Sequence, residues 1–358
     1  MRQMKAIVVE RFKEPLKVEE VPEPHLRNGF DVIVRILNCG VCHTDLHAVD
    51  GDWPIRPNHP FIPGHEGIGT VERVGDMVTN VRVGERVGIP WLHSACGYCC
   101  HCLEGNETLC EQQQNTGYTV NGAFAEYAVA DSRYIARIPA QLSSAEAAPH
   151  LCAGLTAYKA VKVSGSGPHK TVLISGVGGL GHMAVQHAKV TGARLIAVDL
   201  DEEKLSLART LGADETVNAR CVDAADAVKR FGGADIVIGT AVSNLAFQSA
   251  FRCLRRGGRM VLVGLPAGSL PIPIFHLVRK GISVVGSIVG SRKDLKETLD
   301  LAGRGVVTCT YERAAMEDIN DVFLQMRSGK INGRIVLDIA KEQRHDSEQP
   351  AVAHTGAA

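Results

Sequence analysis

The chain has 358 residues, 45% of them hydrophobic and 22% charged, which is typical of a globular protein with a sizeable core rather than a disordered or fibrous one. Its 39 basic and 39 acidic residues give a formal net charge of zero, so no basic stripe indicates nucleic-acid binding. No run of about 18 apolar residues could span a bilayer and the N-terminus lacks the apolar stretch of a signal peptide, so we expect a cytoplasmic protein without a membrane partner.

The segment 1–153 is rich in Gly and Pro and carries short β-type runs at 31–37 and 70–74. This texture predicts a compact, irregular, β-rich domain. Because the chain exceeds the usual size of a single domain, we expect a second domain to follow.

Cysteine and histidine residues within this first segment are spaced in a way that suits a catalytic zinc ion. Such an ion needs about three protein ligands and one open position. Cys42, His65 and Cys152 offer two thiolates and one imidazole. Taken singly, each is more often a buried thiol or a hydrogen-bonded core histidine, so the prediction depends on the whole set.

A second group of thiols is clustered. Five of the 11 cysteines lie between Cys96 and Cys110, and a disulfide framework is not expected in a long chain without a secretory signal. Once Cys100 is set aside the spacing is C-x2-C-x2-C-x7-C, with ligands at Cys96, Cys99, Cys102 and Cys110. Four thiolates can close a tetrahedron around zinc and leave no position for a substrate. We therefore predict a structural zinc site, in which Cys100 breaks the register but could replace a neighbouring ligand.

From residue 171 onward, short apolar runs alternate with helical patterns. The runs lie at 172–174, 195–198, 215–217, 236–238, 260–263 and 283–286. This alternation predicts an α/β domain with a parallel sheet and helices on both faces. We place this domain at 154–290 and expect the chain to return to the first domain over 291–358.

Capping residues and glycines mark the helices of this half. One helix is expected over 201–211, ending before Gly212, and another over 244–255. The last part of the chain should hold one more helix and a closing strand over 333–338. We assign no role to the polar tail 341–358.

A glycine-rich turn directly follows the first apolar run. Residues 176–181 read Gly-Val-Gly-Gly-Leu-Gly, so the strand is followed by G-x-G-x-x-G. The glycines permit a tight turn and close approach of a pyrophosphate, and a helix beginning near Gly179 would point its free N–H groups at the phosphates. We assign dinucleotide binding to Gly176, Gly178, Gly179, Leu180 and Gly181.

Asp199 ends the second strand, 18 residues after Gly181. A carboxylate at that spacing can bind both ribose hydroxyls and would repel a 2′-phosphate, which favours NAD over NADP. Glycine-rich turns are common, and Asp199 alone could be an ordinary strand-end or capping residue. The prediction of NAD depends on the two features together.

Taken in order, these motifs resemble the medium-chain zinc alcohol dehydrogenase family. The resemblance covers roughly residues 4–340 and includes Cys-His-Thr-Asp-Leu-His at 42–47 and Gly-His-Glu at 64–66. It implies a GroES-like β-rich catalytic domain, a structural zinc lobe at about 94–112, and a Rossmann cofactor domain inserted before the final segment. It also implies NAD as cofactor and two zinc ions per chain.

The resemblance implies roles for residues around the catalytic metal. Cys42, His65 and Cys152 would hold the zinc, with Glu66 beside it. Asp45 would orient His65, which is also expected on physical grounds because a ligating imidazole needs a partner for its other nitrogen.

The resemblance also implies contacts with the cofactor and substrate. Lys204 would lie near the adenosine ribose, Arg334 would face the pyrophosphate and Thr156 would touch the nicotinamide end. The closest similarity is to the bacterial branch that acts on short primary alcohols, which places three residues at the substrate pocket: Trp53, Trp91 and Leu92.

The implied reaction is the reversible oxidation of primary, and some secondary, alcohols by hydride transfer from a zinc alkoxide to NAD. Zinc lowers the pKa of a bound alcohol by several units. Thr44 would take the proton first, followed by the cofactor ribose and then His47 as the base in contact with solvent. His47 could also be an ordinary surface histidine.

Other functions remain open at this point. A related dehydrogenase for polyols, aromatic alcohols or glutathione adducts is the main alternative. A non-catalytic NAD-binding relative would be expected to lose ligands that are all present here, and a zinc-dependent nucleic-acid module is disfavoured by the neutral charge. Similar short bacterial enzymes are usually homotetramers, so we expect that assembly.

Overall fold

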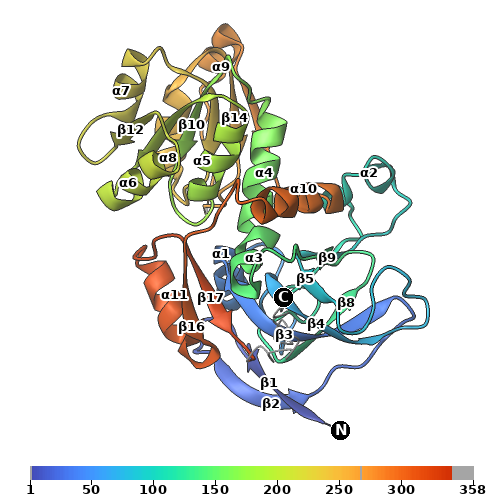
Figure 1. Cartoon of the computed structure of the whole chain (residues 1–358). Helices are drawn as coiled ribbons and strands as arrows, with labels where there is room; N and C mark the ends of the chain where they lie inside the picture. Colours follow the sequence, from blue (N-terminus) through green and yellow to red (C-terminus); the bar gives the residue numbers. More distant parts are fainter. Residues whose placement is uncertain (1, 267, 341–358) are drawn as a thin grey trace, which may run out of the picture.

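The chain folds into two lobes, each built around one large β-sheet (Figure 1). The computed structural model describes residues 2–266 and 268–340. One lobe holds a seven-stranded sheet and the other a six-stranded parallel sheet. Across these described residues, no helix has the length and apolar character needed to cross a membrane.

The seven-stranded sheet joins the two ends of the chain. Its order is β16-β17-β3-β4-β5-β9, and β8 also pairs with β3. The strands are β3 (Asp31–Val41), β4 (Gly67–Val74), β5 (Arg86–Ile89), β8 (Tyr127–Asp131), β9 (Ala136–Arg137), β16 (Tyr311–Ala315) and β17 (Arg334–Asp338). β17 runs antiparallel to β3 with Ile335 opposite Val41, so the last strand lies beside the strand that leads into Cys42.

The core of this lobe forms around β3. Every residue of β3 except Arg35 is buried, so it shows no alternation of apolar and polar side chains. The smaller elements around it are β1 (Gln3–Val8), β2 (Lys17–Pro22), β6 (Leu92–Ser94), β7 (Gln114–Asn115), α1 (His43–Asp50), α2 (Cys100–Leu103), α3 (Ser144–Ala147) and α11 (Ile319–Arg327). Short 3-10 turns lie at Glu107–Leu109, Ala148–Leu151 and Met316–Asp318.

The six-stranded sheet has the order β12-β11-β10-β13-β14-β15. The strands are β10 (Thr171–Ser175), β11 (Arg194–Asp199), β12 (Glu215–Asn218), β13 (Ala234–Gly239), β14 (Leu254–Leu262) and β15 (Ser283–Gly286). Counted along the chain this order is 3-2-1-4-5-6, the doubly wound arrangement in which ligands bind where the strand order reverses. That point lies between the carboxyl ends of β10 and β13.

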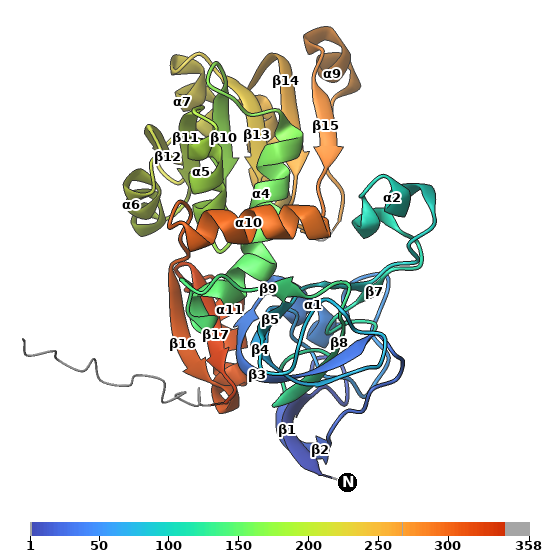
Figure 2. The ribbon, with the colours of Figure 1, turned by 45° about the vertical axis from the view of Figure 1, so that its right-hand side comes forward.

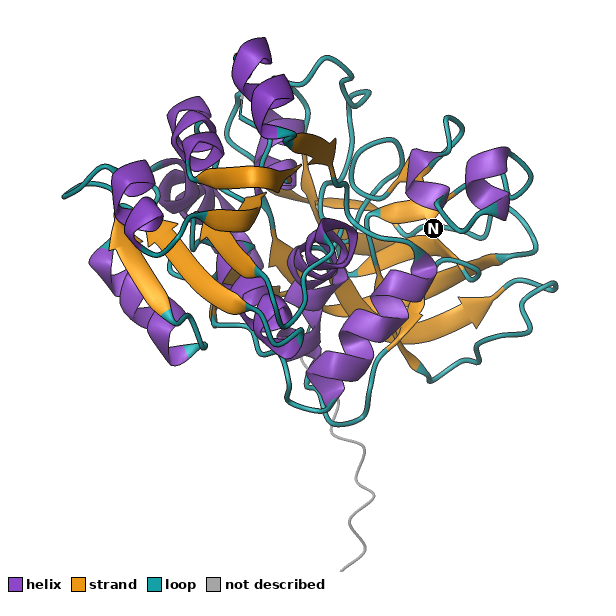
Figure 3. Cartoon of the chain, turned by 90° about the horizontal axis from the view of Figure 1, so that it is seen from above, coloured by secondary structure: helices purple, strands orange, loops and turns teal. Residues whose placement is uncertain are grey.

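Helices cover both faces of this sheet (Figure 3). They are α5 (Gly181–Val190), α6 (Glu202–Thr210), α7 (Ala224–Arg230), α8 (Asn244–Arg252) and α9 (Ile274–Lys280). Two apolar clusters, one on each face, hold the layers together, with Leu195 in one and Leu173 in the other. Two further helices, α4 (Ala153–Ser164) and α10 (Arg292–Gly303), lie at the junction of the lobes (Figure 2).

The structure confirms the expected fold class and all six strands of the second domain. It also confirms the helix after β11, which begins at Glu202 and ends before Gly212, whose φ is 106°. Domain limits at 1–153, 154–290 and 291–358 would leave both large sheets whole, because β16 and β17 join the sheet of the first segment.

Two details of the expected elements are wrong. The helix expected over 244–255 ends at Arg252, because Leu254 already pairs with Ala234 as the first residue of β14. The helix expected near Gly179 is present and begins at Gly181. One helix and a closing strand were expected after residue 290. The chain there forms two helices, α10 and α11, and the additional strand β16 before the closing strand β17. The tail 341–358 lies outside the described residues.

Candidate functional site

Four buried side chains meet in the first lobe, close to where it joins the second. Cys42 directly follows β3, His65 and Glu66 directly precede β4, and Cys152 directly precedes α4. Each residue offers one possible ligand atom, and these four atoms all lie within 4.8 Å of one another. The Sγ atoms of Cys42 and Cys152 are 3.9 Å apart, close to the edge of about 3.8 Å that a tetrahedron with Zn–S bonds of about 2.3 Å requires.

Asp45 connects two of the loops that carry these residues. Its Oδ1 accepts hydrogen bonds from His65 Nδ1 at 2.8 Å and from the Gly64 N–H at 3.1 Å, and its Oδ2 accepts from the Cys42 N–H at 2.9 Å. A carboxylate can only accept, so Nδ1 of His65 carries the proton. In the neutral ring that a metal ligand must have, Nε2 is then the acceptor, and it is buried without a hydrogen-bond partner among the described residues.

The electrostatics of this cluster suit a cation. The Cys152 thiol lowers the pKa of Cys42 far below its usual range, against the effect of burial. Burial lowers the pKa of His65, but Asp45 and the nearby thiolate outweigh it and the pKa is raised overall. Paired thiols with an orphaned imidazole nitrogen are what a zinc site offers before the metal binds, so these residues fit the ion.

Glu66 and Arg334 form a buried ion pair at the edge of the cluster. Arg334 Nη2 donates to Glu66 Oε1, and both side chains are almost fully enclosed. Burial raises the pKa of Glu66 to about 7, although Arg334 opposes it. Gly40 on β3 makes room for this carboxylate, because a Cβ there would collide with Glu66 Oε2. The pair gives the buried carboxyl group of Glu66 a countercharge beside the predicted metal.

Four further thiols meet near α2, in the structural zinc lobe predicted at about 94–112. The Sγ atoms of Cys96, Cys99, Cys102 and Cys110 lie within 4.8 Å of one another. Cys96 and Cys102 are 3.9 Å apart, again near the edge of a zinc tetrahedron. Backbone N–H groups point at the sulfurs: Cys99 N lies 3.4 Å from Cys96 Sγ. Cys100 is exposed and outside this group, so the sequence alternative in which it replaces a neighbour gains no support.

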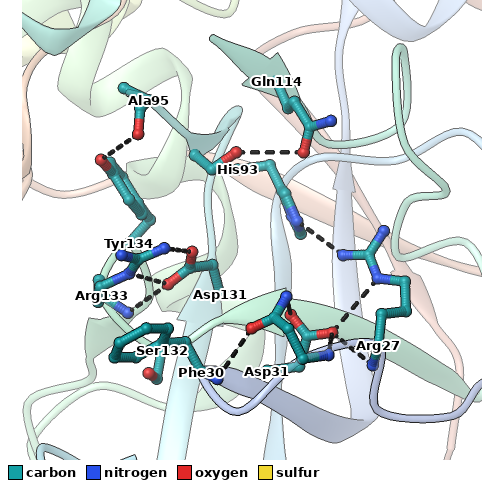
Figure 4. Close-up of polar contacts among 12 residues, drawn as sticks. Arg27, Phe30, Asp31, His93, Ala95, Gln114, Asp131, Ser132, Arg133 and Tyr134 are labelled. Carbon is teal, nitrogen blue, oxygen red and sulfur yellow. Dashed lines mark hydrogen bonds and ion pairs between the residues drawn. The ribbon is translucent and has the colours of Figure 1, made fainter. Parts of the chain in front are cut away.

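Polar contacts connect the structural zinc lobe to the seven-stranded sheet (Figure 4). His93 on β6 accepts a hydrogen bond from Arg27 Nη2 at 3.0 Å, and Arg27 also contacts Asp31 at the start of β3. Because an arginine can only donate, Nε2 of His93 is unprotonated and the ring is neutral. The Tyr134 hydroxyl donates to the Ala95 carbonyl at 3.2 Å, next to the first cysteine.

The glycine-rich turn lies at the carboxyl end of β10, where the strand order reverses. Gly176 adopts a φ of 96°, which favours glycine, and a Cβ on Gly181 would collide with the Gly176 carbonyl. A Cβ on Gly178 would meet no atom within 4 Å, so its backbone faces open space. A Cβ on Gly179 would lie 2.9 Å from Arg334 Cδ, so Arg334 borders both the turn and Glu66. The turn therefore fits a pyrophosphate with the Arg334 cation at its side.

Asp199 stands beside this turn. Its Oδ2 accepts from the Val177 N–H at 2.6 Å, and its Oδ1 accepts from the Leu200 N–H at 2.7 Å. These bonds hold the carboxylate at the edge where a ribose would lie next to the phosphates. Lys204 on α6 donates to the Gly329 carbonyl at 3.4 Å, and Thr156 is buried in the first turn of α4.

The expected proton route begins on α1. Thr44 is half-buried two residues after Cys42, and His47 lies one turn further along the helix. His47 stacks against Trp53 with ring centroids 4.9 Å apart, and Trp91 meets His65 edge-on at 5.2 Å.

Tyr118 lies between the two tryptophans, and no motif in the sequence predicts this position. Its ring centroid lies 5.7 Å from that of Trp53 and 5.6 Å from that of Trp91. Leu92 lines a cavity of about 10 Å³ with Tyr134 and Leu155, and its place in the substrate pocket stays a prediction. Asp52 and Gly40 were also missed, because neither is one of the predicted zinc ligands or part of the glycine-rich turn. The only available signal was that Asp52 directly precedes Trp53.

Known proteins resemble this chain over almost its full length. Residues 28–140 match the family described as alcohol dehydrogenase GroES-like domain, and residues 179–304 match that described as zinc-binding dehydrogenase. An alcohol dehydrogenase of Geobacillus stearothermophilus is 56% identical over 337 residues, covering 94% of this chain and 100% of that protein. The crystal structure of the alcohol dehydrogenase from Aeropyrum pernix has a TM-score of 0.88 at 37% identity and covers 93% of this chain and 99% of that one. An acetophenone reductase of Geotrichum candidum in complex with NAD has a TM-score of 0.86 at 30% identity, covering 94% and 97%.

Proposed function

The chain belongs to the medium-chain zinc-dependent alcohol dehydrogenase family, and from this premise we propose that it oxidises short primary alcohols, and some secondary ones, reversibly at the buried cluster of Cys42, His65 and Cys152. It is a zinc- and NAD-dependent alcohol dehydrogenase. The observation that carries the placement of the reaction is the orphaned Nε2 of His65, which lies among two thiols whose spacing fits a zinc tetrahedron.

The bound groups and the chain divide the chemistry between them. Zinc, when bound, supplies a Lewis acid that makes an alcohol hydroxyl more acidic, and NAD supplies the hydride acceptor. Asp45 keeps the proton on Nδ1 of His65 and so leaves Nε2 free to act as a ligand. Arg334 keeps Glu66 paired, which limits negative charge beside the two thiolates.

The chain must also remove a proton from a buried site. Thr44 follows Cys42 on α1, and its hydroxyl can both accept and donate. His47, with a side chain that is 20% exposed, can accept the proton and release it to solvent. Trp53 and Trp91 would limit the size of the substrate, which supports short alcohols.

Asp199 supports NAD over NADP. Three backbone N–H groups, of Val177, Leu200 and Asp201, hold its carboxylate beside the glycine-rich turn, where it would bind ribose hydroxyls and repel a 2′-phosphate.

We also propose a homotetramer. Ile274, Phe275 and Val278 are exposed on α9, which is next in the chain to the edge strand β15. Apolar side chains that are grouped on a surface favour burial between subunits. Light scattering of the protein as it elutes from a size-exclusion column would measure the mass of the assembly. A monomer at assay concentration would contradict the homotetramer.

One experiment tests the proposed function. Steady-state rates with NAD and NADP are measured against primary and secondary alcohols of graded chain length, and zinc is quantified on the same sample. We expect turnover with NAD that is fastest for short primary alcohols. A folded protein that holds both zinc ions and turns over no alcohol would contradict the proposal.

A further inference from the structure

We propose that Asp52 is a positioning residue for the proton route: it fixes the tautomer and orientation of His47, so that Nε2 of His47 is left as the proton acceptor. The inference rests on the proposed function, because His47 matters only if a proton leaves the site along α1. Nothing in the motifs of the sequence singles out Asp52.

The contact is specific in its geometry. His47 Nδ1 lies 2.9 Å from Oδ1 and 3.0 Å from Oδ2 of Asp52, so both carboxylate oxygens face the same ring nitrogen. An ionised carboxylate only accepts hydrogen bonds, so Nδ1 carries the hydrogen. In the neutral imidazole the second nitrogen is then unprotonated, and Nε2 can receive a proton.

The backbone after α1 is shaped to make this contact. Gly51 ends the helix with a φ of 60°, and its N–H donates to the His47 carbonyl at 2.9 Å. This left-handed turn carries Asp52 back over the last turn of the helix to His47. A Cβ on Gly51 would lie 2.5 Å from the Phe12 ring, so another residue at position 51 would strain the turn.

The next residue restrains the same ring from its face. Trp53 stacks on His47 with an interplanar angle of 22° and a centroid distance of 4.9 Å. Asp52 therefore holds the edge of the imidazole while Trp53 covers its face. Two restraints from consecutive residues leave little freedom for the ring to turn over and exchange its nitrogens.

The exposure of Asp52 argues against a purely stabilising role for its contact with His47. The Asp52 side chain is 45% exposed, and a polar contact this exposed contributes little to the free energy of unfolding. Two other charged residues near α1 have partners of their own: Asp50 pairs with Arg327 at 2.7 Å, and Lys204 donates to the Gly329 carbonyl at 3.4 Å. When His47 accepts a proton the ring becomes a cation, and the carboxylate of Asp52 stabilises it until the proton passes to solvent.

The proposal predicts complete coupling between the two residues. Asp52→Ala should lower kcat by about tenfold to a hundredfold at neutral pH, the same range expected for His47→Gln. The double variant should lose no more than His47→Gln alone, because Asp52 acts only through the imidazole. Added imidazole should restore part of the rate in Asp52→Ala. Asp50→Asn, which changes a neighbouring carboxylate that contacts Arg327, should keep the wild-type rate.

A measurement independent of turnover completes the test. ¹⁵N spectra of the zinc-loaded enzyme without cofactor report which nitrogen of His47 is protonated. We expect the Nδ1–H form in the wild type and in Asp50→Asn, and a mixture or the Nε2–H form in Asp52→Ala. Full activity of Asp52→Ala, additive losses in the double variant or an unchanged tautomer would overturn the proposal. Wild-type protein without alcohol dehydrogenase activity would instead contradict the proposed function and leave the tautomer result to decide the role of Asp52.

Discussion

At the scale of single residues, Asp45 holds together the two loops that supply Cys42 and His65. One carboxylate accepts three hydrogen bonds, from Cys42 N–H, Gly64 N–H and His65 Nδ1, so the position of the thiol is tied to the orientation of the imidazole. The sequence predicted the contact with His65 but not the two backbone bonds. Those depend on Cys42 standing at the first residue before α1, which only the folded chain shows.

Asp199 tests coenzyme choice. In Asp199→Gly the carboxylate that would bind the ribose is gone, so NAD should bind about a hundredfold more weakly, since two charge-assisted hydrogen bonds contribute roughly 3 kcal/mol. Rejection of NADP should relax at the same time. Fluorescence titration with both coenzymes measures the change, and Glu202→Gln serves as a control because its carboxylate pairs with Arg209. Equal use of both coenzymes by the wild type would show that Asp199 does not select between them.

Thr44 tests the first step of the proton route. Thr44→Ala removes the hydroxyl that follows Cys42, so turnover should fall by at least about a hundredfold while both metals remain bound. Thr44→Ser keeps the hydroxyl and should stay active. Added small bases should not restore Thr44→Ala, because they replace only the solvent-side acceptor. An active Thr44→Ala enzyme would refute this route.

At the scale of elements, the sequence predicted most of the fold because its patterns are local. Alternating apolar runs and glycine-rich ends identified all six strands of the cofactor sheet. It failed where the determinant is distant: Leu254 pairs with Ala234 across the sheet, which ends α8 early. Helix α11 was not predicted, although Ile319, Val322 and Phe323 recur at helical spacing within its nine residues, so here the signal was local but short.

The residues of the candidate site could likewise be predicted only where they belong to local sequence motifs. The cysteine spacings and the glycine-rich turn belong to continuous motifs, and the resemblance supplied Arg334. Tyr118 and Asp52 act through contacts with Trp53 and His47 that no motif encodes. Their roles could be inferred only once the turn after α1 and the loop carrying Tyr118 were placed in space.

Helix α10 is anchored to α4 by one buried carboxylate, which gives a stability prediction. Asp294 accepts from Lys159 at 3.0 Å and Lys162 at 2.8 Å, and it caps the helix by accepting from the Ser291 N–H. Asp294→Ala should lower the free energy of unfolding by about 2–3 kcal/mol, since it removes a cap and two charge-assisted bonds. Asp300→Ala breaks only an exposed pair on the same helix and should change it by less than about 0.5 kcal/mol. Urea unfolding compares them, and equal losses would contradict the anchoring role.

At the scale of the whole molecule, buried neutral histidines make stability depend on pH. Burial lowers the pKa of His93, His150 and His182 to about 4 and that of His187 to about 3. The unfolded value is about 6.5, so the unfolded chain binds more protons below it. The contribution of these four histidines to the free energy of unfolding should therefore be fully present above about pH 6.5. It should fall as the pH drops towards 4, by up to about 5 kcal/mol per pH unit for the four groups together.

His187→Phe isolates one of these groups. The phenyl ring can keep the contact with Tyr158, and one titrating group disappears. The slope of stability against pH should decrease by about 1.4 kcal/mol per pH unit between pH 6 and 4, roughly the effect of one proton. Release of zinc in acid affects both proteins alike and cancels in the comparison. An unchanged slope would show that His187 titrates normally in the folded protein.

The central claim is that two separate ligand sets hold two zinc ions and that only the set containing Cys42 is catalytic. Zinc content and turnover measured on the same samples of wild type and Cys42→Ala test it most directly. We expect two zinc ions per wild-type chain, and in Cys42→Ala about one zinc, an intact fold and no measurable turnover, because the four-cysteine lobe keeps its own metal. An active Cys42→Ala enzyme with both zinc ions would contradict it.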